Sequence, residues 1–205
     1  MKILNSKKRV VALALAAVAA TGATAVQAGA ISPTIPLRGS GTVCLTPEAA
    51  RALATQGVKF EAIAPATAAG TCVRLPGTGT LAPDLTGGEL PLQGGMRFSS
   101  SGHRLDLTDV RVHIHIVEGN TTADASQNGA PARNIELVRF PVSLSRVSFT
   151  PTTVDTRNVP LNLTAPGAAA FTSAFGTSPV AVGTPLFTFD GHGEITNPLS
   201  GPALP

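Results

Sequence analysis

Two histidines stand two residues apart in a segment that alternates apolar and polar residues. His113 and His115 lie between Val112 and Ile116, and residues i and i+2 of a β-strand point to the same face. Two imidazoles on one face are a candidate metal site. Arg111 falls on that face as well, and its positive charge repels a cation. We therefore favour the alternative, a polar and solvated strand face, because the spacing identifies no third ligand.

Two cysteines, Cys44 and Cys72, are the only thiols of the chain. An isolated pair in an exported protein usually forms a disulfide. Two buried free thiols are the alternative. Closing a loop of this length stabilises a protein by roughly 3–4 kcal/mol in the chain-entropy estimate.

No motif typical of catalysis accompanies these residues. The chain contains neither a Gly-x-Ser-x-Gly nucleophile elbow nor a His-Glu-x-x-His metal motif. The Gly191-x-Gly193 pair lacks the lysine and the following helix of a phosphate loop. The sequence therefore predicts a protein that is not an enzyme, and a hydrolase with an unrecognised site is the remaining enzymatic alternative.

The N-terminus has the residue order of an export signal. Basic residues within positions 2–9 precede an apolar run over 10–20, and small residues follow as far as Ala28. That order predicts a cleavable signal peptide over residues 1–28. The apolar run is shorter than the roughly 20 residues that a spanning helix needs. We therefore expect a secreted protein without a transmembrane segment.

Removal of the signal changes the charge of the protein. The full chain has 15 Lys and Arg against 12 Asp and Glu. Four of the basic residues lie in the predicted signal, so charges of the two signs nearly balance in the remainder. No basic cluster or Tyr/Trp platform remains, which argues against a nucleic-acid partner.

The rest of the chain predicts strands rather than long helices. Glycine (21) and proline (17) are frequent, and residues between them alternate apolar and polar, notably over 105–116. The alternation changes phase at Thr108-Asp109, where we expect a bulge. Residues 120–133 are polar without periodicity and indicate an exposed loop. The sequence predicts one secreted β-rich domain over residues 29–205.

Two short helices are expected among the strands. Thr46 is placed as an N-cap before a proline at the first helical position, and a second helical segment runs from Thr164 to Gly176. Similar glycine pairs follow both segments. They predict two related strand–helix–strand units, near residues 42–87 and 159–201. Two independent helices with similar caps are the alternative.

Residues 87–114 read GGELPLQGGMRFSSSGHRLDLTDVRVHI. This segment resembles the central motif of HtaA-like domains, which are extracellular modules of high-GC bacteria. Residues 159–176, VPLNLTAPGAAAFTSAFG, resemble the closing segment of the same family. The resemblance covers patches between residues 80 and 190. It implies a β-sandwich of antiparallel strands with two short helices, in agreement with the strand pattern.

Some HtaA-like domains bind haem through Tyr and His side chains, and the resemblance implies His103 as the corresponding histidine. The chain has no Tyr, so a phenolate ligand is absent. We expect a non-enzymatic extracellular binding or surface module for an unidentified ligand or partner, with no cofactor assigned and the oligomeric state open. The alternative is a haem-binding protein that uses His103 as an axial ligand.

Overall fold

The computed structural model describes residues 34–196, and the predicted signal peptide over 1–28 lies outside them. The described chain forms twelve strands, two α-helices and one short 3₁₀-helix, η1. In chain order they are β1 (Ile35–Leu45), α1 (Pro47–Thr55), β2 (Lys59–Ile63), β3 (Thr67–Ala69), β4 (Cys72–Leu81), β5 (Gly87–Pro91), β6 (Gly95–Ser100), β7 (His103–His115), β8 (Glu118–Gln127), β9 (Arg133–Pro141), η1 (Leu144–Arg146), β10 (Val147–Phe149), β11 (Thr153–Leu163), α2 (Ala165–Phe175) and β12 (Pro185–Ile195).

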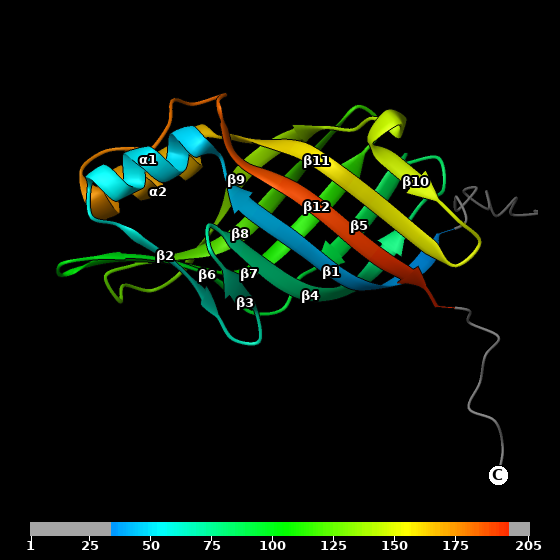
Figure 1. The fold of residues 1–205 in the computed structure, drawn as a ribbon, viewed down its shortest axis with the longest axis horizontal. Helices are drawn as coiled ribbons and strands as arrows, with labels where there is room; N and C mark the ends of the chain where they lie inside the picture. The colour runs from blue at the N-terminus through cyan, green and yellow to red at the C-terminus, as the bar shows by residue number, and fades with distance from the viewer. Residues whose placement is uncertain (1–33, 197–205) are drawn as a thin grey trace, which may run out of the picture. The chain divides into compact units, whose positions relative to one another are not determined.

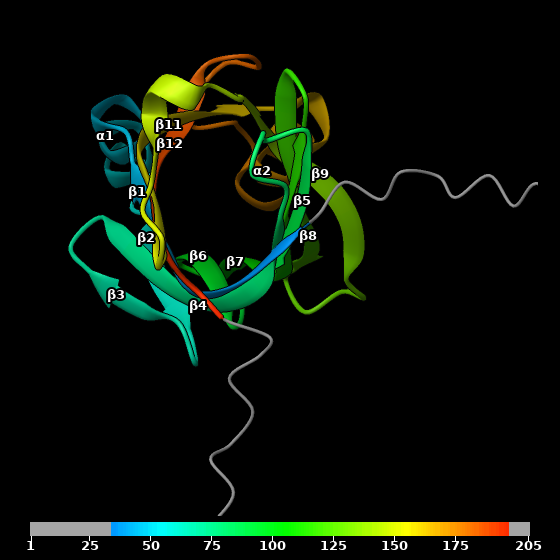
Figure 2. The same cartoon turned by 90° about the vertical axis from the view of Figure 1, so that its right-hand side faces the viewer.

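Eight of these strands form a closed antiparallel barrel (Figures 1 and 2). Their order is β7-β5-β4-β1-β12-β11-β9-β8, and β8 pairs again with β7 to close the ring. Strand β7 pairs with β6 over its first half and with β5 over its second half, while β8 pairs along both. Strands β6 and β2 therefore extend the sheet outside the ring, and β3 and β10 pair with β4 and β11.

The mainly β class with two helices is confirmed, but the strands form a barrel rather than the predicted sandwich. Both arrangements need strands that alternate apolar and polar residues, so alternation could not separate them. The ring closes through β8, which lies in the segment predicted as a loop. That loop prediction was wrong because β8 buries only small residues, which carry little apolar signal: Gly119, Thr121, Ala123 and Ala125. The bulge expected near Thr108 is confirmed by a register shift between Thr108 and Arg111.

Both helices lie at the same end of the barrel (Figure 1). Helix α1 follows β1, and the Thr46 hydroxyl accepts a hydrogen bond from the Ala49 amide at 3.3 Å. Helix α2 connects β11 to β12, and the Thr164 hydroxyl accepts one from the Gly167 amide at 3.1 Å. These side-chain caps satisfy amides that the first helical turn leaves unpaired. The positions of both helix starts were predicted correctly.

An aromatic cluster fills the barrel beneath the helices. The ring of Phe98 lies 4.8 Å from that of Phe171 on α2, in an edge-to-face contact, and 4.9 Å from that of Phe60. Phe98 and Phe171 are fully buried, and Phe187 of β12 is nearly so. Offset and edge-to-face aromatic pairs are favourable beyond the area they bury. The helix end is therefore a packed core, which we call the closed end.

Glycines occupy inward positions of three neighbouring strands at the middle of the barrel. Gly39 of β1 pairs with Gly77 of β4 and Gly193 of β12, and Gly41 pairs with Gly191. A Cβ placed on Gly39 would lie 1.9 Å from the carbonyl oxygen of His192. The strands approach too closely at Gly39 for any side chain. At Gly41 and Gly191 the ring of Phe189 occupies the space that a Cβ would need. We call these inward glycines the glycine wall.

Neither helix in residues 34–196 has the length and apolar character needed to cross a membrane. The two related units proposed near 42–87 and 159–201 stay a prediction. Residues 197–201 of the second unit fall outside the described part of the chain.

Candidate functional site in the barrel interior

An apolar cavity of about 140 Å³ occupies the barrel interior. Its lining extends from Met96 and Phe187, near the helices, to Val147 and Val154 at the opposite end, and includes the glycine wall. Protein interiors normally contain few voids larger than a water molecule. An apolar cavity of about 150 Å³ can stay dry and bind a small hydrocarbon. The interior is therefore a candidate site for an apolar ligand.

One polar atom in the lining has no partner. The hydroxyl of Thr156 is buried and makes no hydrogen bond to another described residue. Thr156 is the last regularly paired residue of β11, opposite Gly191, before a register shift between Thr156 and Val159. A buried donor or acceptor without a partner costs about 1–3 kcal/mol. A ligand with one polar atom could restore that hydrogen bond.

The end of the barrel opposite the helices has its own apolar cluster. Its members come from seven strands and from two adjoining segments, and the buried ones are Leu37, Leu81, Leu85 and Val154. No α-helix covers this end, and η1 and β10 lie beside the strand ends there (Figure 1). Arg146 of η1 belongs to the cavity lining and donates a hydrogen bond to the carbonyl oxygen of Asn158. We call this the open end.

A polar row crosses the outside of the barrel. His192 Nδ1 lies 2.7 Å from Asp155 Oδ1, and this hydrogen bond holds the pKa of Asp155 below its usual value. Ser40 stands opposite His192 in the register of β1 and β12. The order Ser–His–Asp is that of a nucleophilic triad. However, the Ser40 hydroxyl accepts a hydrogen bond from Arg74 Nε at 2.9 Å, and His192 is half exposed.

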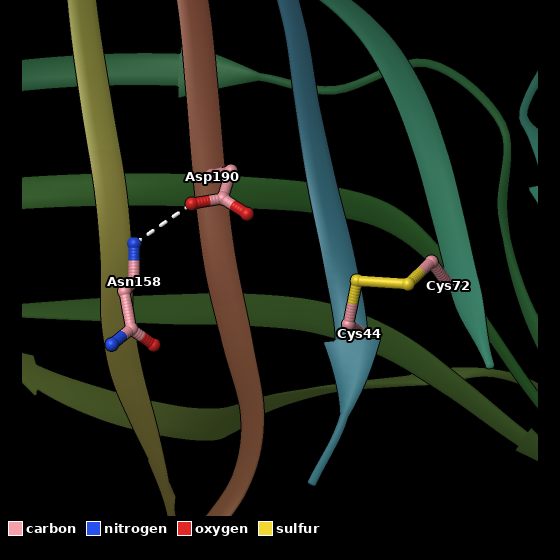
Figure 3. The surroundings of a disulfide bond; sticks show 4 residues. All are labelled: Cys44, Cys72, Asn158 and Asp190. Carbon is pink, nitrogen blue, oxygen red and sulfur yellow. Dashed lines mark hydrogen bonds between the residues drawn. A yellow bond between two sulfur atoms is a disulfide. The ribbon is translucent and has the colours of Figure 1, made fainter.

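That row therefore differs from an enclosed catalytic centre. The hollow around it is shallow and lies on the outer surface of β1, β4, β11 and β12. Close to it, the backbone amide of Asn158 donates a hydrogen bond to Asp190 at 2.7 Å (Figure 3). The hydrogen bonds of the row join neighbouring strands, so they stabilise the wall of the barrel.

The disulfide lies on the same outer surface (Figure 3). Cys44 of β1 and Cys72 of β4 are bonded to one another and are direct partners in the strand register. The predicted pairing of the two cysteines is confirmed. Cys44 is the penultimate residue of β1, so the cross-link ties β1 to β4 next to helix α1. Covalent and aromatic contacts thus reinforce the same end of the barrel.

The histidines singled out from the sequence do not gather at the cavity. His103 is exposed at the turn between β6 and β7 and is absent from the cavity lining. His113 Nε2 lies 3.2 Å from the Thr122 hydroxyl, and His115 is exposed. Arg111 pairs with Asp109 and Glu89. Within residues 34–196, no three His, Cys, Asp or Glu side chains form a group that could hold a metal ion.

Sequence reasoning missed the cavity. It also missed the two polar side chains of the lining discussed above, Thr156 and Arg146. One signal was present in the sequence. The Gly-x-Gly pairs of β1, β4 and β12 stand at positions where a strand would normally place buried side chains. Glycine inside a strand often marks close approach by another backbone or by a ligand.

The geometry defines a small closed barrel with an apolar cavity inside it, and barrel folds commonly place ligand sites in such cavities. The family model named HtaA, with the description "Htaa", matches residues 42–178. The chain therefore belongs to the HtaA family, and the resemblance seen in the motifs is confirmed.

Three solved structures from Corynebacterium glutamicum share this fold. The C-terminal domain of HtaA is 13% identical, with 78% of this chain and 99% of that chain covered and a TM-score of 0.61. The N-terminal domain of HtaA is 14% identical, with the same coverages and a TM-score of 0.57. Heme binding protein HtaB is 14% identical, with 80% and 96% covered and a TM-score of 0.51. No curated protein sequence matches the chain.

Proposed function

We propose that this protein is a non-enzymatic extracellular binding module that takes an apolar ligand into its barrel. The observation that carries the proposal is the apolar cavity of about 140 Å³ between the closed and open ends. The export signal read from residues 1–28 supports an extracellular location. Burial of apolar surface would provide the affinity, at about 25 cal/mol per Å² removed from water.

The dimensions of the cavity indicate a slim ligand. Sites for drug-sized molecules usually measure about 300–1,000 Å³, so the interior suits a single alkyl chain or one small ring. Two polar groups along the lining could receive a polar end: the unpaired Thr156 hydroxyl and Arg146 at the open end. The ligand class that fits best is therefore an amphiphile with one apolar chain.

A cavity-filling substitution tests this proposal. Val112 lines the cavity and is buried, whereas Val182 is 57% exposed and lies outside the lining. Isothermal titration calorimetry with octanoate, an amphiphile with one short alkyl chain, should show saturable binding by the wild type. Val112→Phe should weaken that binding at least tenfold, because the larger ring occupies the void, and Val182→Phe should leave it unchanged. Equal affinity in all three proteins would overturn the proposal, once thermal melts show that each is folded.

Haem is the second candidate ligand, because a solved structure with this fold is titled heme binding protein HtaB. The residues present here do not fit an enclosed haem site. The chain has no Tyr, His103 lies exposed on a turn, and the cavity is smaller than a macrocycle requires. Binding by His103 would leave much of the macrocycle in solvent. We therefore expect haem binding that is weak and depends on His103.

Titration with haemin, followed at the Soret band, separates the two candidates. The wild type should bind weakly, and His103→Ala should abolish that binding. His115→Ala is the matched control, because His115 is an exposed histidine of the same strand. Tight, saturable haemin binding by the wild type would make haem, rather than an apolar amphiphile, the proposed ligand.

A further inference from the structure

One side chain in the lining of the barrel cavity carries a permanent charge. It is the guanidinium of Arg146 in η1, because arginine stays protonated at every pH at which proteins are folded. Within residues 34–196, the lining contains no aspartate or glutamate. His192 is its other ionisable member, and that imidazole is hydrogen-bonded to Asp155 on the outer surface. The lining therefore presents positive charge to a ligand.

Arg146 lies where the cavity meets solvent. The residue is exposed, and it also belongs to the lining. The next residue, Val147, is the register partner of Thr156, which lines the cavity as well. Arg146 Nη1 donates a hydrogen bond to the carbonyl oxygen of Asn158, two residues beyond Thr156 on β11. These contacts hold the guanidinium beside β11, at one end of the cavity.

Most donors of this guanidinium are unused within residues 34–196. Arginine has five N–H donors, and the Asn158 carbonyl oxygen is the one acceptor that Arg146 reaches in this part of the chain. No ion pair between described residues includes Arg146. Its Nε and Nη2 therefore have no described partner. Arg97 uses the same two nitrogens to bind both carboxylate oxygens of Asp106, at 2.7 and 3.0 Å. The open side of Arg146 thus matches a carboxylate.

Acids on the surrounding strands and turns do not occupy that side. They lie outside the lining, and four of them accept hydrogen bonds from other groups: Asp84 from Thr86, Glu89 from Arg111, Asp155 from His192, and Asp190 from the amide of Asn158. Two more stand beside other arginines, because Glu194 is the register partner of Arg38 and Glu118 acts on Arg139. Nε and Nη2 of Arg146 are therefore available to the carboxylate of a ligand.

We propose that the ligand of this cavity is a carboxylic acid with one alkyl chain. Its carboxylate binds Arg146, and its chain lies along the apolar lining with the methyl end towards Met96 and Phe187. A carboxylate placed deeper in the barrel would lose its hydration without a counter-ion, whereas one at Arg146 gains charge-assisted hydrogen bonds. This inference rests on the apolar ligand proposed above and adds the chemistry of its polar end.

Calorimetric titrations near pH 7 with octanoate and with 1-octanol, whose polar end is neutral, test the role of the carboxylate. The wild type should bind octanoate at least about tenfold more tightly, which is the effect of one charge-assisted hydrogen bond. Arg146→Gln should bring the two affinities to within about threefold, because glutamine keeps a donor for the Asn158 carbonyl but carries no charge. Arg157→Gln is the matched control and should keep the wild-type ratio, since it removes the same charge from an exposed residue of β11 outside the lining.

Equal affinity of the wild type for the two compounds would overturn the carboxylate assignment and leave the cavity ligand in place. An unchanged preference in Arg146→Gln, or an equal loss of preference in Arg157→Gln, would do the same. Val112→Phe, which fills the cavity, should weaken both compounds, and a wild type that binds neither would refute the cavity ligand itself.

The salt dependence of the wild type provides the test if Arg146→Gln does not fold. Raising NaCl from about 20 mM to about 0.5 M should weaken the binding of octanoate and leave that of 1-octanol unweakened, because salt screens the contact between two charges. Octanoate binding that is independent of salt would overturn the assignment of the carboxylate to Arg146.

Discussion

The two ends of the barrel are built for different tasks. The closed end has two capped helices, the Phe98–Phe171 contact and the Cys44–Cys72 disulfide. The open end has no α-helix, and its turns and short segments carry four large exposed hydrophobic side chains, Ile116, Val117, Leu144 and Phe149. Regions with few buried contacts open at lower free energy than packed cores. The comparison indicates that stability is concentrated at the closed end.

The largest expected difference between the ends comes from a pair of phenylalanines. Phe171→Ala removes a fully buried ring at the closed end and should lower the free energy of unfolding by about 3–5 kcal/mol. Phe149→Ala removes a partly exposed ring at the open end and should cost less than about 1 kcal/mol. Urea denaturation of both variants measures the difference. Similar losses would break the distinction between the two ends.

Loss of the disulfide should have the next largest effect. The double variant Cys44→Ser, Cys72→Ser should lose roughly 3–4 kcal/mol of stability, because the unfolded chain regains the freedom of the closed loop. Hydrogen exchange should then accelerate most in β1 and β4 near helix α1. The same exchange pattern in the wild type after reduction is the internal control. An unchanged unfolding transition would mean that the closed end does not depend on the cross-link.

The unpaired hydroxyl of Thr156 gives a prediction of the opposite sign. Thr156→Val replaces a buried polar atom that lacks a partner with a methyl group of similar size. The ligand-free protein should become more stable by about 1 kcal/mol. Thr80→Val, at an exposed position of β4, should change stability by less than about 0.5 kcal/mol. A destabilised Thr156→Val would show that this hydroxyl does have a partner, which a bound ligand or an ordered water would supply.

The smallest expected effect is on the pH dependence of stability. The hydrogen bond from His192 lowers the pKa of Asp155 in the folded state. A carboxyl with a depressed folded pKa stabilises the protein above its unfolded pKa, and that stability is lost as the pH falls through the folded value. The wild type should therefore be more stable than His192→Ala near pH 6, and the two should converge towards pH 2. Unfolding curves across that range test it, and a constant difference would contradict the assignment.

The features predicted correctly from the sequence are those that depend on a few adjacent residues. The capping threonines, the paired cysteines and the phase change at Thr108 were each visible in a few adjacent residues. Strand β8 was missed because its inward side chains are glycine, alanine and threonine, which resemble a loop in composition. The pairing of His192 with Asp155 depends on strand register across 37 positions. The cavity depends on the closure of all eight strands, so neither could be read from local sequence.

The glycines of the glycine wall differ in how much space an added side chain would find. At Gly39 an added methyl group would collide with the carbonyl oxygen of His192 at 1.9 Å, so this position is closed to every other residue. At Gly193 the same methyl would lie 3.7 Å from the side chain of Leu37, an ordinary contact. A single methyl group at Gly193 would therefore narrow the cavity while the strands stay in place. Two glycines that are paired in the same wall thus differ, because strand pairing requires glycine at Gly39, whereas Gly193 leaves room for a small side chain.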